Sequence, residues 1–223
     1  MKLNIAIDGP SASGKSTIAK ELAKRLNYTH LDTGAMYRAC TYKALKYNVD
    51  TNCEDDLVKM VDSSHFAFDE LGHIHIDGKD VSSKIRSKEI DLLTSKIAQY
   101  PKLRQSLVLI QQSIAKEKGF ILDGRDIGSV VLPDADIKIF QTASIESRAR
   151  RRLNEYKSNG LEIDYQTIYK EIEQRDYQDQ NREYSPLIKT DDAYLLDTSD
   201  LSIDESVEIV YSLAIKKLNE RSD

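Results

Sequence analysis

The sequence predicts an α/β layered fold built on a parallel sheet that is buried on both faces. Short runs rich in Ile, Val and Leu recur at intervals too long for hairpins, which is typical of strands in such a sheet. Amphipathic helical patterns fill most of the gaps between these runs. A chain of 223 residues is also long enough for one core domain that carries insertions.

Five strands and seven helices follow from these patterns. We expect strands over residues 3–7, 28–31, 120–122, 137–140 and 194–196. We expect helices, several of them opened by Ser, Thr or Asp caps, over residues 15–26, 35–47, 86–99, 102–117, 145–158, 165–179 and 204–218.

Two regions do not fit a minimal α/β core. Residues 48–95 contain HFAFDELGHIHIDGKDV, whose alternation and Leu71-Gly72 turn predict a small antiparallel hairpin in a substrate-side insert. Residues 146–187 are dense in charge, and we interpret them as a mobile cover, or lid. The expected single domain over 1–223 then has a core of about 1–47, 96–145 and 188–223.

Composition restricts the classes of partner. The net charge of −5 and a pI near 5.5 give no overall field that would attract nucleic acid or an anionic membrane. Two cysteines are too few for a disulfide framework, and the chain shows neither a secretory leader pattern nor an apolar run of about 18 residues. We therefore expect a cytoplasmic protein with no nucleic-acid or membrane partner.

The stretch GPSASGKST predicts a phosphate-binding loop. It follows a short apolar strand that ends at Asp8, and a helical pattern starts at its lysine, which is the order found in a P-loop. Glycines let successive N–H groups point inward, and the helix N-terminus adds positive potential where phosphates lie. The residues expected to bind a nucleoside triphosphate are Gly9, Pro10, Ser11, Ala12, Ser13, Gly14, Lys15, Ser16 and Thr17. Lys15 is expected to reach the β- and γ-phosphates, and Ser16 to ligate Mg²⁺.

Two further turns follow predicted strands, and ligands of open α/β sheets bind beyond the carboxyl ends of strands. In DTGAMYR, small residues open a helix and Arg38 lies about one turn in, suited to gripping an anion. In LDGRD, Asp123 directly follows a strand, where P-loop enzymes hold the acid that orients Mg²⁺ through water. Arg125 and Asp126 come next in the same crevice.

Two arginine stripes lie in the region expected to form the lid. Arg148, Arg151 and Arg152 share one helix face in SRARRRL. Arg175, Asp179 and Arg182 form a second stripe in EQRDYQDQNRE. The stripes fit a closing lid that neutralises transferring phosphates, and a solvated, salt-bridged helix is the alternative.

As a set, these motifs resemble the bacterial cytidylate kinases, a branch of the nucleoside monophosphate kinases. IDGPSASGKST, LDTGAMYR, YPKLRQ, LDGRDIGSVVLPDA and RDYQDQNREYSPL occur in that family's order and spacing. The resemblance implies a three-layer P-loop kinase core with a parallel sheet, a monophosphate-binding insert with a small antiparallel sheet, and a short helical lid. It also implies MgATP and CMP or dCMP as substrates.

The resemblance assigns roles to individual residues. Arg38, Arg125 and Arg182 would hold the CMP phosphate; Ser95, Arg104 and Asp126 would read the cytosine; Tyr37, Arg175 and Asp179 would contact the sugar side, with Thr33 also in the substrate site. The groups expected to act in catalysis are Lys15, Asp123, Arg125, Arg148, Arg151 and Arg152, with Ser16 and Asp123 at the metal. An ionised Asp126 can accept from the exocyclic amine of cytosine, whereas uracil offers a carbonyl there.

Rival functions remain open at this stage. The nearest is a P-loop kinase for another small acceptor, such as UMP or shikimate. A P-loop nucleotide switch or an RNA-binding ATPase that uses RARRR is a rival of another class, although the chain has no guanine-reading Asn/Thr-Lys-x-Asp loop and its charge is acidic. We expect a monomer, because no apolar interaction stripe is left over.

Overall fold

A computed structural model gives the structure of the chain and describes residues 2–158, 160 and 162–221. The predicted lid, 146–187, includes residues 159 and 161, which lie outside the described residues, as do residues 1, 222 and 223 of the predicted domain.

The centre of the molecule is a five-stranded sheet in which every pairing is parallel. The strands in spatial order are β2 (Thr29–Asp32), β6 (Phe120–Gly124), β1 (Ile5–Asp8), β7 (Ile137–Thr142) and β8 (Tyr194–Asp197). The predicted strands and α/β class are confirmed, with each strand placed within two residues of its expected ends. In the register, Asp123 lies between Ile7 of β1 and Asp32 of β2, so the polar ends of three strands meet at one edge.

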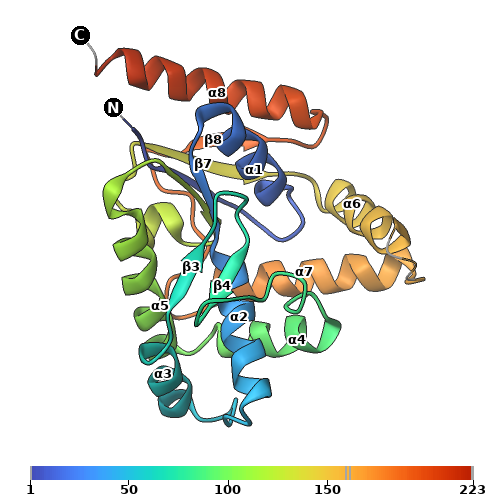
Figure 1. Cartoon of the computed structure of the whole chain (residues 1–223). Helices are drawn as coiled ribbons and strands as arrows, with labels where there is room; N and C mark the ends of the chain where they lie inside the picture. The colour runs from blue at the N-terminus through green and yellow to red at the C-terminus, as the bar shows by residue number, and fades with distance from the viewer. Residues whose placement is uncertain (1, 159, 161, 222–223) are drawn as a thin grey trace.

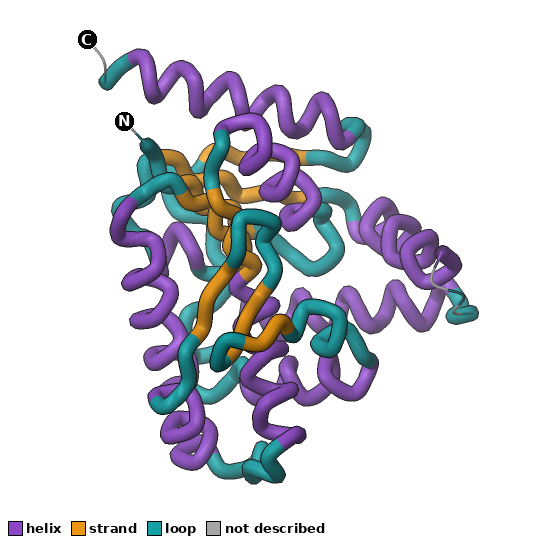
Figure 2. Tube along the Cα trace, in the orientation of Figure 1, coloured by secondary structure: helices purple, strands orange, loops and turns teal. Residues whose placement is uncertain are grey.

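Helices cover both faces of this sheet (Figures 1 and 2). Ile5 and Ile7 of β1 pack with α1 (Lys15–Leu26) and α8 (Ile203–Asn219), whereas Ala6 packs on the opposite face with α2 (Thr33–Lys46) and α5 (Pro101–Ile114). Each fully buried isoleucine contributes about 1.5–3 kcal/mol of transfer free energy. Burial on both faces explains why the strands read as nearly continuous apolar runs.

The region predicted as an insert contains two helices and a small antiparallel sheet. Its elements are α3 (Glu54–Asp62), β3 (Phe66–Phe68), β4 (Ile74–Ile76), β5 (Lys79–Asp80) and α4 (Lys88–Ile97). The predicted hairpin is confirmed, and Gly72 in its turn adopts φ +77°, a conformation that favours glycine. Apolar side chains of the insert join the same cluster as Ala6 and Leu31, so the insert packs directly on the core.

Two helices, α6 (Ile145–Ser158) and α7 (Tyr165–Asn181), form most of the region predicted as a lid, and Figure 1 shows them extending from one side of the sheet. They pack on one another through Ala149, Ile168 and Ile172, and Ala12 of the glycine-rich loop joins this small cluster. The division into core, insert and lid stays a prediction.

Several helix boundaries differ from expectation by one to three residues, and two of these differences have local reasons. Helix α2 begins at Thr33, two residues earlier than predicted, because the carboxylate of Asp32 accepts a hydrogen bond from the N–H of Ala35 at 2.9 Å and caps the helix there. Helix α5 ends at Ile114, and the rest of the predicted helix is a 3₁₀ turn, η1 (Ala115–Glu117). No helix within the described ranges is long and apolar enough to span a bilayer.

Candidate active site

The glycine-rich loop connects β1 to α1 at the carboxyl edge of the sheet. A Cβ on Gly9 would lie 1.9 Å from the backbone oxygen of Gln141 on β7, so only glycine fits where the loop leaves the strand. Gly14 has φ +89° and forms the N-cap of α1, with no side chain capping that terminus. The loop therefore presents a helix N-terminus with free N–H groups, which suits an anion.

Lys15 is buried beneath this loop. Its Nζ donates to the backbone oxygen of Pro10 at 2.7 Å and to Oγ of Ser13 at 3.3 Å. Burial, reinforced by the nearby Arg125 cation, lowers the pKa of Lys15 to about 7. A phosphate bound in the loop would supply the opposite charge that this ammonium needs.

Polar side chains from distant segments form hydrogen bonds with the backbone of the loop. The backbone oxygen of Ser13 accepts from Nε2 of Gln141 at 2.5 Å and from Nη1 of Arg151 at 3.1 Å. Asp176 of α7 accepts from the N–H of Ser11 at 3.2 Å. Sequence reasoning missed Gln141, whose only signal is a polar residue in an apolar strand, and Asp176, which adjoins the predicted Arg175.

The three arginines of the predicted stripe on α6 contact different partners. Arg148 is buried and donates to the backbone oxygen of Ser11 at 3.1 Å and to Asp176 at 2.5 Å. Arg151 also contacts the loop, whereas Arg152 lies 3.1 Å from Glu155 and 3.9 Å from Asp91 of the insert. Two of the stripe's members thus support the loop, and the third faces the insert.

Asp123, at the end of β6, is the centre of a buried network. One carboxylate oxygen, Oδ2, accepts from Oγ of Ser16 at 2.7 Å, and Oδ1 lies 2.6 Å from Nε2 of His30. Thr33 donates to the backbone oxygen of the same residue at 2.8 Å. Burial opposes ionisation, but hydrogen bonds from His30 and Ser16 outweigh it and hold the pKa of Asp123 below its usual range.

The donor set at Asp123 fits Mg²⁺, which prefers hard oxygen ligands and is commonly bound by one or two carboxylates together with phosphates and water. Ser16 and Asp123 supply a hydroxyl and a carboxylate next to the loop. Among the described residues, no group of three His, Cys, Asp or Glu side chains could hold a metal ion alone. An ion here would therefore depend on a bound nucleotide.

A second cluster lies beyond Asp123 and is built around a buried ion pair. Nη2 of Arg104, from α5, donates to Oδ2 of Asp126 at 2.5 Å, and both side chains are less than a tenth exposed. The Arg104 guanidinium stacks over the Tyr37 ring at 5.4 Å, and burial raises the pKa of Tyr37 to about 12. Two buried donors, Nε of Arg104 and Nη2 of Arg182, have no hydrogen-bond partner among the described residues.

Asp179 of α7 gathers three of the predicted arginines. Its carboxylate lies 2.7 Å from Nε of Arg125, 3.4 Å from Nε of Arg175 and 3.9 Å from Nη1 of Arg182. Although burial opposes it, the attraction of Arg125 and Arg175 lowers the pKa of Asp179 to about 2. One carboxylate cannot neutralise three guanidinium groups, so the cluster keeps an excess of positive charge.

The insert contributes a third wall. Arg38 donates through Nε to Asp91 of α4 at 2.9 Å, and Arg175 donates to Oγ of Ser95 on the same helix. Like Gln141 and Asp176, Asp91 is a residue that sequence reasoning did not single out.

Asp8 links the strand that leads into the glycine-rich loop to the turn that follows Asp126. Its carboxylate accepts from the N–H of Ile127 at 2.8 Å and of Gly128 at 2.7 Å, in the short π-helical turn η2 (Ile127–Val131). Burial raises the pKa of Asp8 to about 6. The strand that leads into the phosphate loop thereby fixes the turn that follows Asp126.

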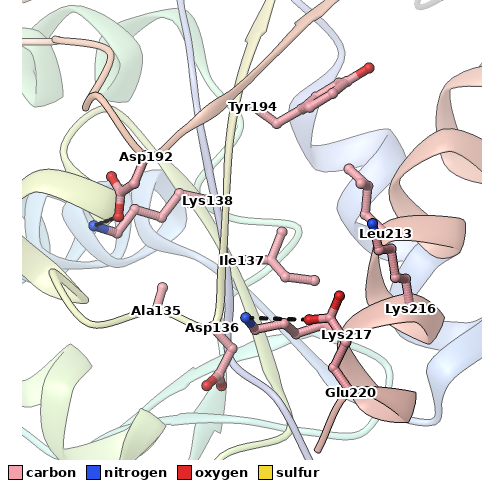
Figure 3. A pocket seen from close by; sticks show the side chains of 10 residues that line it. All are labelled: Ala135, Asp136, Ile137, Lys138, Asp192, Tyr194, Leu213, Lys216, Lys217 and Glu220. Atoms are coloured by element: carbon pink, nitrogen blue, oxygen red, sulfur yellow. Dashed lines mark ion pairs between the residues drawn. The ribbon is translucent and has the colours of Figure 1, made fainter.

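A pocket of about 400 Å³ elsewhere in the molecule is not this site (Figure 3). It lies between α8 and the starts of β7 and β8, at the amino ends of the strands, and two of its lining lysines are already paired, Lys138 with Asp192 and Lys217 with Glu220. The predicted chemistry gathers at the opposite, carboxyl edge.

Comparison with known proteins agrees with this geometry. The family model of the cytidylate kinases matches residues 5–216. A cytidylate kinase of Enterococcus faecalis is 44% identical over 219 residues, covering 97% of both chains, and one of Caldanaerobacter subterraneus is 47% identical over 217 residues, covering 97% of this chain and 96% of that one.

A solved structure of an uncharacterized protein from Eubacterium ventriosum shares the fold alone: it is 13% identical, with a TM-score of 0.52, over 96% of this chain and 98% of that chain. The sequence match, by contrast, extends through the glycine-rich loop, the Asp123 network and both arginine clusters. The chain belongs to the cytidylate kinase family.

Proposed function

We propose that the protein transfers the γ-phosphoryl group of MgATP to CMP or dCMP, giving CDP or dCDP and ADP. The observation that carries this proposal is the buried Arg104–Asp126 pair, together with Nε of Arg104 and Nη2 of Arg182, which lack a hydrogen-bond partner among the described residues. Buried donors without partners are costly, so their presence favours a polar ligand at that point.

The donor half of the reaction would use the glycine-rich loop. Its N–H groups and the start of α1 would bind the ATP phosphates, and Lys15 would exchange its hydrogen bond to Pro10 for the β- and γ-phosphates. Ser16 and Asp123 would hold Mg²⁺, which neutralises charge on the phosphate oxygens when it is bound.

The acceptor half would bind the phosphate of CMP among Arg38, Arg125 and Arg182. This phosphate is an anion at neutral pH, so no general base is required, and the task of the protein is to align it with the γ-phosphate and neutralise charge. Arg125 lies close enough to Lys15 to lower the pKa of that lysine. This supports a site in which the γ-phosphate and the CMP phosphate would lie next to each other.

Cytosine would be read by Asp126 and Arg104, with Ser95 nearby. Asp126 can accept from the exocyclic amine, and the free Nε of Arg104 can donate to the ring carbonyl or nitrogen. A uracil carbonyl facing Asp126 would leave a buried carboxylate without a donor, which disfavours UMP. The ribose would lie near Tyr37, Arg175 and Asp179, with Thr33 at the edge of the site.

Arg151 and Arg152 are proposed to neutralise the transferring phosphate when the lid closes, and closure would keep water from competing as acceptor. Arg148 donates to the loop, to Asp176 and to the backbone oxygen of Ala143, so its contribution would be to position the loop. A monomeric, cytoplasmic enzyme without nucleic-acid or membrane partners stays a prediction.

The test is a coupled ADP-release assay with MgATP against CMP, dCMP, UMP, AMP and shikimate. We expect turnover with CMP and dCMP that collapses in Asp126→Ala and persists in Asp134→Ala, a matched control in which the acid is exposed. Turnover with UMP or shikimate but none with CMP would overturn the proposed acceptor, although the protein would still be a kinase. Nucleic-acid binding without phosphoryl transfer would overturn both.

A further inference from the structure

His30 is a buried polar side chain that the reaction outlined above does not use. It lies on β2 with 3% of its side chain exposed, and its Nε2 is 2.6 Å from Oδ1 of Asp123, which is itself 5% exposed. The two residues are 93 positions apart, so the fold brings them together. Within the described part of the chain, the other ring nitrogen, Nδ1, is buried with no hydrogen-bond partner.

An unpartnered buried nitrogen costs free energy, so packing alone does not account for a histidine at this position. An apolar side chain of similar size would avoid that cost, and the neighbouring strand positions are filled by apolar residues such as Leu31 and Ile121. What histidine gains here is its contact with Asp123.

Because of this contact, the two carboxylate oxygens of Asp123 have different partners. His30 occupies Oδ1, while Oδ2 faces Ser16, the second proposed ligand of Mg²⁺. With Oδ1 held, the carboxylate cannot rotate about its Cβ–Cγ bond without losing the His30 contact, so Oδ2 keeps its place beside Ser16. Partners of this kind orient ligands in the same way around other protein metal sites.

The insert completes the environment of the ring. A Cβ on Gly72, in the turn between β3 and β4, would lie 3.6 Å from Nδ1 of His30 and 3.5 Å from its backbone oxygen. Figure 1 shows the tip of this hairpin reaching the edge of the core sheet. The turn therefore covers the histidine and keeps its bond to Asp123 away from solvent.

We propose that His30 is a positioning residue that fixes the carboxylate of Asp123 for binding the Mg²⁺ of the nucleotide complex. The proposal rests on the proposed function, because that function supplies the metal. It predicts that loss of the Nε2 contact weakens metal binding and turnover, and leaves the binding of CMP unchanged.

The test compares two substitutions of similar length and shape, His30→Gln and His30→Met. The glutamine amide can donate to Asp123, whereas the methionine thioether cannot. His73→Leu is the matched control, since it removes a histidine that lies 3.1 Å from a different carboxylate, Asp69, on the same insert hairpin. Circular dichroism and thermal unfolding establish that each variant is folded.

Two readouts separate positioning from a structural role. The first is the affinity of the ADP complex for Mn²⁺, used as the probe metal and followed by electron paramagnetic resonance. The second is the division of the kinetic effect between kcat and the KM for CMP at several Mg²⁺ concentrations. We expect His30→Met to lose about 10- to 100-fold in Mn²⁺ affinity and in kcat with an unchanged KM for CMP. We expect His30→Gln and His73→Leu to stay close to wild type.

A folded His30→Met protein with wild-type Mn²⁺ affinity and kcat would overturn the proposal, as would equal losses in the glutamine and methionine variants. If neither variant folds, the wild-type protein with ¹⁵N-labelled histidine decides: the His30 ring resonance must shift when Mg²⁺ joins the ADP complex, and no shift overturns the proposal. Failure of the wild-type protein to phosphorylate CMP would instead contradict the proposed function.

Discussion

The two halves of the site are built from different materials. The donor half is mostly backbone: a glycine-rich loop whose carbonyl oxygens already hold Lys15 and Arg151. The acceptor half is mostly side chain: arginines paired with Asp91, Asp126 and Asp179. A backbone site recognises phosphates in general, whereas a site of buried ion pairs makes a ligand exchange one charged partner for another. Under the proposed function, this difference would give general binding of ATP phosphates in one half and selective binding of one monophosphate in the other.

Removing Lys15, the cationic side chain proposed to act in the donor half, gives the largest expected effect. We expect Lys15→Ala to lower kcat by about 10³-fold, or about 4 kcal/mol, because Lys15 is the ammonium proposed to neutralise charge on the β- and γ-phosphates. Steady-state kinetics with CMP measures the loss. Lys20→Ala, an exposed lysine on the same helix, is the control and keeps wild-type turnover. Full turnover of the Lys15 variant would contradict the role proposed for this lysine at the β- and γ-phosphates.

The backbone itself is tested by Gly9→Ala. The added methyl would lie 1.9 Å from the backbone oxygen of Gln141, so β1 and β7 must separate where the loop starts. We expect a loss of about 3 kcal/mol of unfolding free energy in urea and a matching loss of ATP affinity.

Gly78→Ala separates the clash from backbone strain. Gly78 also has a positive φ, +74°, but a Cβ there meets nothing within 4 Å. We expect it to cost about 1 kcal/mol. If Gly9→Ala and Gly78→Ala lose the same free energy of unfolding, the close approach of Gly9 to β7 does not contribute to the loss.

Acid should weaken the acceptor half first, because that half depends on ionised carboxylates. Asp179 has a pKa of about 2 in the folded protein against an ordinary value of 3.8. A lowered pKa stabilises the fold fully above about pH 4, and this contribution, about 2 kcal/mol, disappears as the pH falls through 2. Urea unfolding between pH 2 and 5 should show a smaller pH dependence in Asp179→Asn. An unchanged slope would argue against the pairing with Arg125 and Arg175.

The smallest effect is expected at the outer wall of the acceptor half. Asp91 is 39% exposed and holds Arg38 through a single nitrogen, so this pair is worth well under about 1 kcal/mol. Its negative charge lies where the CMP phosphate would enter. We expect Asp91→Asn to lower the KM for CMP by about two- to fourfold at low salt and to leave kcat unchanged. Glu89→Gln, an exposed acid on the same helix, is the control, and a raised KM in the Asp91 variant would mean that it orients Arg38 instead.

The sequence allowed the sheet and the loop to be predicted because both depend on local patterns: apolar runs, glycine spacing and helix caps. Helix α3 was not predicted as a separate element, since it has only nine residues and precedes the hairpin that dominates the pattern of the predicted insert. The three strand-end turns were found in the same local way.

The contacts that organise the site could not be predicted. His30 reaches Asp123 across 93 residues, and Gln141 reaches Ser13 across 128. Such pairings depend on the order of strands in the sheet, which apolar periodicity does not encode. The shared face of Arg148, Arg151 and Arg152 was read from helical spacing, but their separate partners depend on where the loop and the insert lie.

Ala12 belongs to the phosphate loop and also to the small apolar cluster that holds α6 against α7. Local opening of a segment is governed by the contacts it must break, and here the two helices cannot separate without disturbing the loop. The amide protons near Ile168 and Ile172 should therefore exchange with deuterated solvent more slowly once the loop is filled. The exchange rates of amide protons in α6 and α7 would then report whether nucleotide occupies the glycine-rich loop. They can be measured with ADP alone, without turnover.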